Sequence, residues 1–250
     1  MLRLVQMVFL FVVLLSSTAK AEVWSVRADT WCPYNCEPGS ANPGYMIEIL
    51  DQAAKATGNK VDYKLMPWAR ALEEVRADKI TAVVGLTDGD RDGLLVSDKM
   101  GLDATCFFVN EGDSFKYHAL ADLSRLASVG TASGYEYADD FMKWAKANPG
   151  RIQPITGDNP LDANVKKLKA HRITALVENP SVLEYARKSI KELQGVVLAG
   201  CMPSNPLYIG VGAKHAKAAD IVKAVNATAE KLRQSGELDK ILAKYGMKAW

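Results

Sequence analysis

The chain has 250 residues, in which 31 Lys and Arg stand against 29 Asp and Glu, and 48% of the residues are hydrophobic. This length is enough for one large domain or for two lobes of about 100 residues each, a common domain size. Charges of both signs are scattered along the chain, without the clustered basic face that nucleic acid requires, so no nucleic acid partner is expected.

Residues 1–21 have the three parts of a secretory signal peptide. Arg3 supplies a positive start, residues 7–15 are an unbroken apolar run, and the segment ends in Ala-Lys-Ala, a small-x-small cleavage site. A retained membrane anchor is the alternative, but the run is shorter than the roughly 20 residues of a spanning helix. We expect cleavage before Glu22, which leaves residues 22–250 near neutrality and exported to the periplasm.

After the signal, the first half of the chain alternates strands and helices. We expect a strand over 23–28, a loop rich in Cys, Pro, Asn and Gly over 30–44, a helix over 45–57, a strand over 61–65, a helix from Pro67 and a buried strand over 80–84. This βαβαβ order is typical of a parallel α/β fold.

The second half repeats the pattern after a strand over 105–109 and a polar passage over 110–116. We expect strands over 126–129 and 152–155, a turn over 130–134, and helices over 137–147 and 181–188. Two further strands over 196–198 and 207–211 flank a return passage near 199–206, and helices over 216–235 and 237–244 end the chain.

One helix-strand unit occurs twice. The apolar and basic positions of residues 72–84 recur in residues 165–177, the same spacing 93 positions later. Two copies indicate two lobes, which we place at residues 22–110 plus 205–250 and at residues 111–204; two ordinary units in one larger sheet are the alternative. Ligands of open α/β sheets bind beyond the carboxyl ends of the strands, so the side chains after each repeated strand should face a common cleft.

The four cysteines are Cys32, Cys36, Cys106 and Cys201. In an exported protein they indicate two disulfides, for which three pairings are possible. We favour Cys32 with Cys36, which a short loop containing proline holds close, and Cys106 with Cys201, which lie in segments near the crossing between lobes. A four-thiolate zinc site is the alternative, but the spacing matches paired zinc knuckles poorly.

Other motifs fail. Residues 88–93 match the first half of a calcium loop, but the position that requires a bidentate Glu is Lys99, so a solvated acidic turn is expected. The turn over 130–134 leads toward a helix whose N–H groups could receive an anion. No catalytic triad, P-loop or metal-ligating histidine pattern is present in the sequence, and we expect no metal and no cofactor.

The order of short motifs along residues 22–250 resembles the family 3 extracellular solute-binding proteins of bacterial ABC transporters. The motifs are Pro43-Gly44-Tyr45, Pro67-Trp68, Gly85-x-Thr87 leading to Arg91, Leu120-Ala121-Asp122-Leu123, Gly134-Tyr135-Glu136-Tyr137, His171-Arg172-Ile173-Thr174-Ala175, Leu207-Tyr208-Ile209 and Lys244-Tyr245-Gly246. The resemblance implies the type II periplasmic binding protein fold, in which each lobe is a mixed, mainly parallel sheet flanked by helices. Two crossover hinge segments join a lobe built from both chain ends to one built from the middle.

The resemblance also implies a ligand site. Arg91 stands where members bind the ligand carboxylate, for which a planar guanidinium suits a bidentate pair. Positions 34 and 68, Tyr34 and Trp68, match an aromatic wall around the ligand. The turn Gly134-Tyr135-Glu136 matches a second-lobe segment that touches the carboxylate end, and Asn179 falls where members usually place an Asp for the ammonium.

Three departures from the pattern leave open whether the ligand is a standard α-amino acid. The spacing from Thr87 to Arg91 is one residue short, and Arg70 is a second candidate cation. Glu136 replaces a small hydroxyl residue, and an acid there would repel a carboxylate. With Asn in place of Asp at position 179, Glu178 or Glu136 is left to pair with an ammonium.

We therefore expect a monomeric periplasmic binding protein, not an enzyme, that captures a small polar solute, an amino acid or a related organic ion, by hinge closure and delivers it to the membrane permease of an ABC transporter. One alternative is a sensor whose closure is detected by a membrane signalling protein. A second is a dehydratase-type enzyme on the same fold, with Glu136 or Glu178 as the acid, and a third is an orphan binder with a degenerate site.

Overall fold

The computed structural model describes residues 21–157 and 159–249, so all but the last residue of the expected signal peptide lies outside the described part. Within these residues no helix is long and apolar enough to cross a bilayer. The strands are β1 (Val23–Ala28), β2 (Lys60–Leu65), β3 (Ala82–Leu86), β4 (Leu94–Val96), β5 (Gly101–Asn110), β6 (Val129–Ala132), β7 (Ile152–Ile155), β8 (Ala175–Glu178) and β9 (Val196–Gly212).

The α-helices are α1 (Tyr45–Ala56), α2 (Trp68–Arg76), α3 (Asp139–Ala147), α4 (Pro160–Lys169), α5 (Pro180–Ala186), α6 (Ala218–Gln234) and α7 (Glu237–Lys244). Single 3-10 turns are η1 (Asp88–Asp90), η2 (Leu120–Arg125), η3 (Pro149–Arg151) and η4 (Lys191–Leu193). These elements agree with the expected strand–helix alternation in both halves of the chain.

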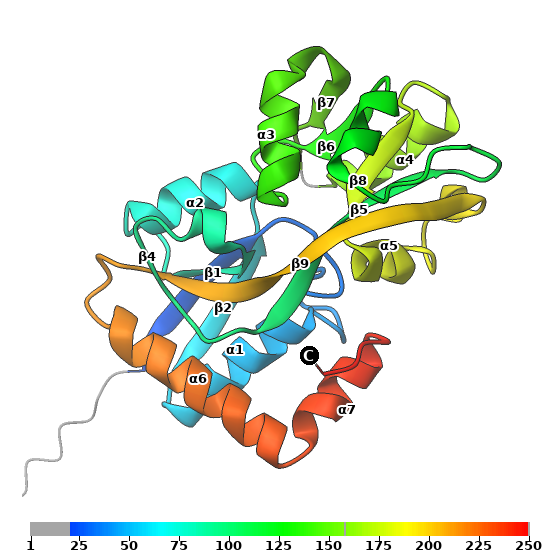
Figure 1. Ribbon diagram of the computed structural model, residues 1–250. Coiled ribbons are helices and arrows are strands. Elements are labelled where there is room, and N and C mark those ends of the chain that lie inside the picture. The colour runs from blue at the N-terminus through cyan, green and yellow to red at the C-terminus, as the bar shows by residue number, and fades with distance from the viewer. Residues whose placement is uncertain (1–20, 158, 250) are drawn as a thin grey trace, which may run out of the picture.

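The strands form one continuous path in the order β2-β1-β3-β9-β5-β8-β6-β7, with β4 paired to β9. At one end β1 pairs in parallel with β2 and β3, and at the other end β6 pairs in parallel with β7 and β8. The antiparallel strands β5 and β9 join the two ends and run between the two halves of the molecule (Figure 1). The result is two lobes, each with a mainly parallel sheet.

The crossings are strands rather than the loops that the sequence analysis expected. Strand β9 is continuous through residues 199–206, and β5 begins at Gly101, four residues before the expected start. Proline has no N–H to donate, which suggested a loop at Pro203 and Pro206. In the described structure this part of β9 pairs only with β5, so both prolines are tolerated at an unpaired edge.

A second difference concerns residues 130–132, which continue β6 instead of forming the expected turn. Gly130 permits this because a Cβ there would lie 2.4 Å from Oδ1 of Asn164 on α4. The glycine therefore allows α4 to pack directly against the strand, and its turn-like appearance in the sequence was misleading.

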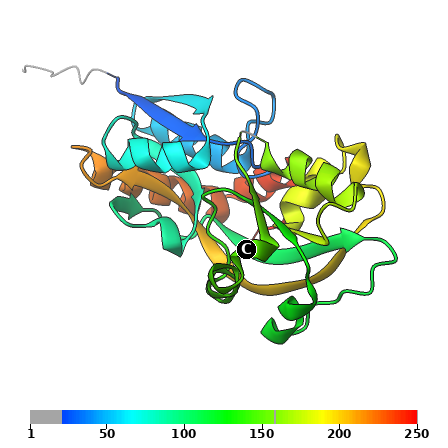
Figure 2. The ribbon, with the colours of Figure 1, turned by 90° about the horizontal axis from the view of Figure 1, so that it is seen from above.

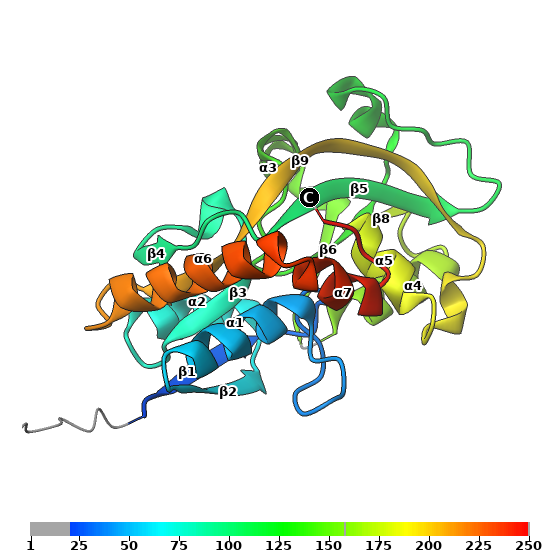
Figure 3. The same ribbon diagram turned by 90° about the horizontal axis from the view of Figure 1, so that it is seen from below.

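Helices cover both faces of the first sheet. Helices α1, α6 and α7 pack over one face with a shared apolar core, and α1 and α6 lie side by side there (Figure 3). Helix α2 packs on the other face through Trp68, Leu72 and Val75. Because the apolar positions of α2 recur every three or four residues, one stripe of the helix is buried and its other face is left to the charged residues.

The second lobe has its own cores. Phe107, Phe115 and Phe141 pack together beside α3, and Val165 and Leu168 of α4 enter a further cluster with Leu176 of β8. Seen from above, β5 and β9 pass side by side from the first lobe to the second (Figure 2). Apart from Val182 of α5, which packs into the core of the first lobe, each lobe has its own core. Two cores joined by two paired strands are an arrangement that allows one lobe to rotate relative to the other.

Two disulfides are present, Cys32–Cys36 and Cys106–Cys201, the pairing favoured from the sequence. The first closes the turn after β1. The second links β5 to β9, whose residues Cys106 and Cys201 are direct partners in the sheet. It therefore crosslinks the two strands that join the lobes.

Candidate functional site

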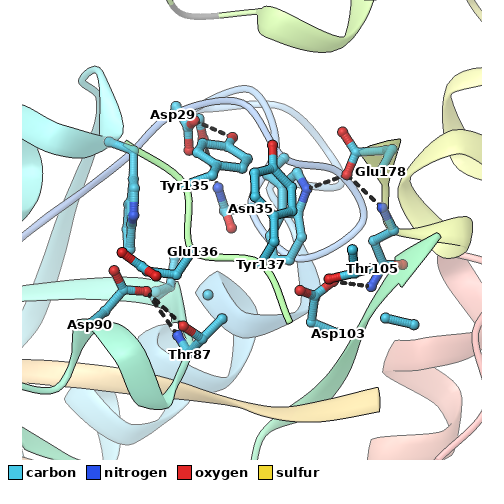
Figure 4. Close-up of a pocket in the computed structure, with 16 residues that line it drawn as sticks. Asp29, Asn35, Thr87, Asp90, Asp103, Thr105, Tyr135, Glu136, Tyr137 and Glu178 are labelled. Atoms are coloured by element: carbon cyan, nitrogen blue, oxygen red, sulfur yellow. Dashed lines mark hydrogen bonds between the residues drawn. The ribbon is translucent and has the colours of Figure 1, made fainter. Parts of the chain in front are cut away.

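A cavity of about 480 Å³, counted with the space open to solvent at its mouth, lies where the two lobes meet. Its walls come from both lobes and from β5 (Figure 4). The described residues that line it are Asp29, Trp31, Asn35, Trp68, Val84, Gly85, Thr87, Asp90, Asp103, Ala104, Thr105, Tyr135, Glu136, Tyr137, Glu178 and Asn179. The set is dominated by carboxyl groups and aromatic rings, and it includes no Lys, Arg or His.

Trp31 is held by a tight turn after β1. Its backbone N–H donates to the carbonyl of Asn35 at 2.9 Å, and its indole stacks on the Tyr34 ring with centroids 4.3 Å apart. Gly85 lies beneath the indole, where a Cβ would come within 3.3 Å of the ring, and its φ of 82° also favours glycine. The turn and the glycine together place a flat aromatic surface against the cavity.

One end of the cavity is formed by Asp90 and Glu136, whose carboxyl groups face each other (Figure 4). Asp90 is 4% exposed, and its Oδ2 accepts from the backbone N–H of Thr87 at 3.0 Å. Burial raises the pKa of the Asp90 carboxyl, and burial followed by the nearby Asp90 charge raises that of Glu136. Two acids brought together in this way make a site of strong negative potential.

The opposite end is formed by Glu178, Asp103 and Asn179. Oε1 of Glu178 accepts from the indole Nε1 of Trp31 at 3.0 Å and from the Asn179 backbone at 2.8 Å. Oδ1 of Asp103 accepts from Nδ2 of Asn179 at 2.8 Å. Burial raises the pKa of the Glu178 carboxyl to about 7, although these two N–H donors oppose the change. Burial likewise raises the pKa of Asp103.

A fifth acid, Asp29, lies between the two ends on one wall (Figure 4). Its Oδ2 accepts from the hydroxyl of Tyr135, which belongs to the turn between β6 and α3 of the other lobe. Its backbone carbonyl accepts from Nδ2 of Asn35 at 2.6 Å. Oδ1 of Asn35 is fully buried without a hydrogen-bond partner, so the cavity contains an unused acceptor as well as carboxylates.

The structure brings together six residues proposed from the sequence, and all six line the cavity: Trp68, Thr87, Tyr135, Glu136, Glu178 and Asn179. The Asn179 side chain has structural partners. Its Oδ1 caps α5 by accepting from the Ser181 N–H at 2.8 Å, while its Nδ2 donates to Asp103.

Four proposed residues do not line the cavity. Arg91 pairs with Asp88 at 2.9 Å and lies 5.0 Å from the centroid of the Tyr208 ring. Arg70 pairs with Glu74 on the exposed side of α2.

The other two proposed residues outside the cavity are Tyr34 and Gly134. Tyr34 is buried behind Trp31, and its hydroxyl donates to the Leu102 carbonyl. Gly134 forms a turn against Ala69.

The position of Arg91 has a local cause. The short segment after Thr87 folds as η1, in which the Thr87 hydroxyl donates to Asp90, and the chain turns before Arg91 can reach the cavity.

Sequence reasoning missed several lining residues, among them Asp29, Trp31, Asn35, Asp90 and Asp103. The first three lie directly after the opening strand, in a segment from which the sequence analysis proposed only Tyr34. Asp103 is a buried acid within β5, and the alternation of apolar and polar residues from Gly101 onward was the available signal.

A family model of the bacterial extracellular solute-binding proteins, family 3, matches residues 26–248. A probable histidine-binding protein of Neisseria gonorrhoeae is 26% identical over 213 residues, which cover 81% of this chain and 74% of that protein.

Similar solved structures include an ancestral arginine-binding protein bound to arginine (24% identity, TM-score 0.73, covering 90% of this chain and 98% of that chain). A mutant of ArgBP from T. maritima has 16% identity and a TM-score of 0.73, covering 90% of this chain and 95% of that one. A histidine kinase sensor domain similar to periplasmic binding proteins has 16% identity and a TM-score of 0.74, covering 90% and 96%. These likenesses show the two-lobed type II periplasmic binding protein fold, and the chain belongs to the bacterial extracellular solute-binding proteins of family 3.

Proposed function

We propose that this chain is exported through a cleaved signal peptide and works in the periplasm as a monomeric solute-binding protein. It captures a small polar solute, an amino acid or a related organic ion, by closure of its two lobes, and presents it to the membrane permease of an ABC transporter. Residues 22–110 with 205–250 form one lobe and residues 111–204 the other, with the hinge at β5 and β9.

The observation that supports this function is that groups from both lobes meet across the cavity. The Trp31 indole donates to Glu178, and the Tyr135 hydroxyl donates to Asp29. Each pair joins a side chain of one lobe to a side chain of the other, so these contacts depend on the angle between the lobes. A solute bound among these groups would add further contacts across the same gap and favour the closed arrangement.

Ligand binding and closure can be tested together on the exported protein, cleared of bound solute by unfolding and refolding with its disulfides intact. A screen of amino acids, amines and organic ions should find a ligand class that raises the melting temperature. Ligand at about 100 times the dissociation constant adds about 2.7 kcal/mol, which for a protein of this size is a shift of about 5–10 °C.

The same ligand should lower the radius of gyration in small-angle X-ray scattering. A Trp31→Ala variant should lose the shift, because the indole forms one wall of the cavity and holds Glu178. A screen in which no solute raises the melting temperature or compacts the protein would contradict the proposed function.

A sensor remains the second candidate, supported by the fold-level likeness to a histidine kinase sensor domain. The two functions differ in the partner of the closed form. Crosslinking in membranes of the native host should trap a permease subunit under our proposal and a signalling protein under the alternative. Recovery of the ligand unchanged after long incubation would separate both from the dehydratase alternative, in which Glu136 or Glu178 serves as the acid.

A further inference from the structure

We propose that the cavity selects an organic cation that carries two positive charges and no carboxylate, such as a linear diamine, rather than an α-amino acid. This inference rests on the proposed binding function and names its substrate class. It comes from the placement of the acidic groups, the aromatic walls, one unused acceptor and the ion pairs that hold Arg91 and Arg70 outside the cavity.

The acidic groups fall into two sets at opposite ends of the cavity (Figure 4). Asp90 of η1 and Glu136 of the opposite lobe face each other at one end. Glu178 of β8 and Asp103 of β5 form the other end, and Asp29 lies on the wall between them. Each end has more carboxyl groups than a single charge needs, so a ligand with a positive group at each end would be matched along its length.

Within each set, some acceptor positions are already occupied by the protein and others are not. At the first end the backbone N–H and the hydroxyl of Thr87 both donate to Oδ2 of Asp90. At the second end, Trp31 and Asn179 both use Oε1 of Glu178, and Asn179 uses Oδ1 of Asp103. These hydrogen bonds orient Asp90, Glu178 and Asp103, and Trp68 and the Ala104 backbone are further donors to Asp90 and Asp103. An ammonium with three donors can bind the lone pairs that remain on these carboxyls and on Glu136.

A separate observation points to a donor-rich ligand. Asn35 is 1% exposed, and its Oδ1 has no hydrogen-bond partner although the residue lines the cavity. A buried acceptor without a partner lowers the stability of the protein, so a ligand N–H that reaches it is favoured. Figure 4 shows the Asn35 amide between Tyr135 and the open space of the cavity.

The walls between the acidic ends are aromatic. Trp31, Trp68, Tyr135 and Tyr137 all line the cavity, and the Trp31 and Tyr135 rings meet edge to face with centroids 6.4 Å apart. Such rings pack against the methylene chain of an amine and attract its cationic ends through the ring quadrupole.

A ligand carboxylate would enter an unfavourable field. Arg91 and Arg70, the cations proposed for it, are paired with Asp88 and Glu74 outside the cavity. Arg76 does not line the cavity either, and its guanidinium donates to the backbone carbonyls of Asp90 and Asp92. Glu136 lies where the resemblance places the carboxylate end, and two acids forced together repel. A metal ion is also disfavoured, since within residues 21–157 and 159–249 no group of three or more His, Cys, Asp or Glu has a metal-binding arrangement.

Matched ligand pairs test the inference directly. Isothermal titration of the exported protein should compare 1,4-diaminobutane with ornithine, which differs from it by one carboxylate, and with butylamine, which lacks the second ammonium. We expect the diamine to bind at least about tenfold more tightly than either, because a buried unpaired charge is strongly disfavoured. The pairs 1,5-diaminopentane with lysine, and agmatine with arginine, extend the test to other lengths.

Variants at the two ends provide the internal controls. Glu136→Gln and Asp103→Asn should each weaken the diamine by about tenfold, since each removes one charge that faces the ligand. Glu73→Gln, which removes an exposed carboxylate from α2, should change nothing.

Tighter binding of ornithine, lysine or arginine than of the matching amine would overturn the inference and leave the binding function intact. The same holds if another solute class binds and no amine does. If no solute binds at all, the proposed function fails as well.

Discussion

Replacing Glu178 with Gln should stabilise the ligand-free protein at high pH and leave it unchanged at low pH. The side chain is 9% exposed, and burial raises its pKa from 4.5 to about 7. Below pH 4.5 the carboxyl is protonated in both the folded and the unfolded chain. Between pH 4.5 and 7 the unfolded chain ionises first, so the folded state loses stability as the pH rises, and above pH 7 the loss is complete.

The size of the effect follows from the pKa change. Each pKa unit corresponds to about 1.4 kcal/mol, so the raised pKa lowers the free energy of unfolding at pH 8 by about 3 kcal/mol. Gln does not titrate, and its Oε1 can keep both hydrogen bonds that Glu178 accepts from Trp31 and Asn179. The Glu178→Gln variant should therefore exceed the wild type by about 3 kcal/mol at pH 8, or about 6–12 °C in melting temperature.

Urea unfolding of both proteins at pH 4 and pH 8, without ligand, measures this difference. A matched control is Glu184→Gln, which removes an exposed carboxylate from the neighbouring helix α5. It should show no pH-dependent gain. If the Glu178→Gln variant differs from the wild type equally at both pH values, the burial argument is refuted.

Three further outcomes are expected. Arg91→Ala should leave the affinity of any identified ligand within about twofold, because the guanidinium lies outside the cavity and surface ion pairs contribute about 1 kcal/mol or less. A tenfold loss of affinity in titration calorimetry would mean that Arg91 contacts the ligand. Tyr135→Phe should weaken ligand binding several-fold, since it removes the hydroxyl that donates to Asp29 of the other lobe. An unchanged affinity would mean that this hydrogen bond has no role in closure. Replacing Cys106 and Cys201 with Ala should lower the unfolding free energy by about 2–5 kcal/mol, measured by urea unfolding, and a smaller loss would mean that the strands alone hold the crossing.

Much of the fold could be predicted because local sequence patterns indicate where its helices and strands lie. The expected strand over 152–155 and helix over 237–244 have the observed bounds, since apolar periodicity and clear breakers mark both ends. The disulfide pairing also agreed with the structure. Strands β5 and β9 were only partly recognised, because their pairing is long-range and prolines at an unpaired edge look like a loop in the sequence.

The site was less accessible to sequence reasoning. Glu178 and Asn179, at the end of a repeated strand, were found because strand ends meet at one edge of a sheet. Arg91 was proposed both from its place after a repeated strand and from motif order, but the segment after Thr87 folds as η1 and Arg91 lies outside the cavity. Trp31 and Asn35 depend on a disulfide-closed turn whose direction no local pattern reveals.

The Cys106–Cys201 bond has a topological consequence. Because it joins the chain where it leaves the first lobe to the chain where it returns, residues 107–200 form a covalent ring attached to the first lobe. A single peptide-bond cut anywhere in that ring leaves one connected molecule. A circular permutation could therefore place new chain ends in a surface loop of the second lobe and join the original ends. The disulfide would still link β5 to β9 between the two lobes.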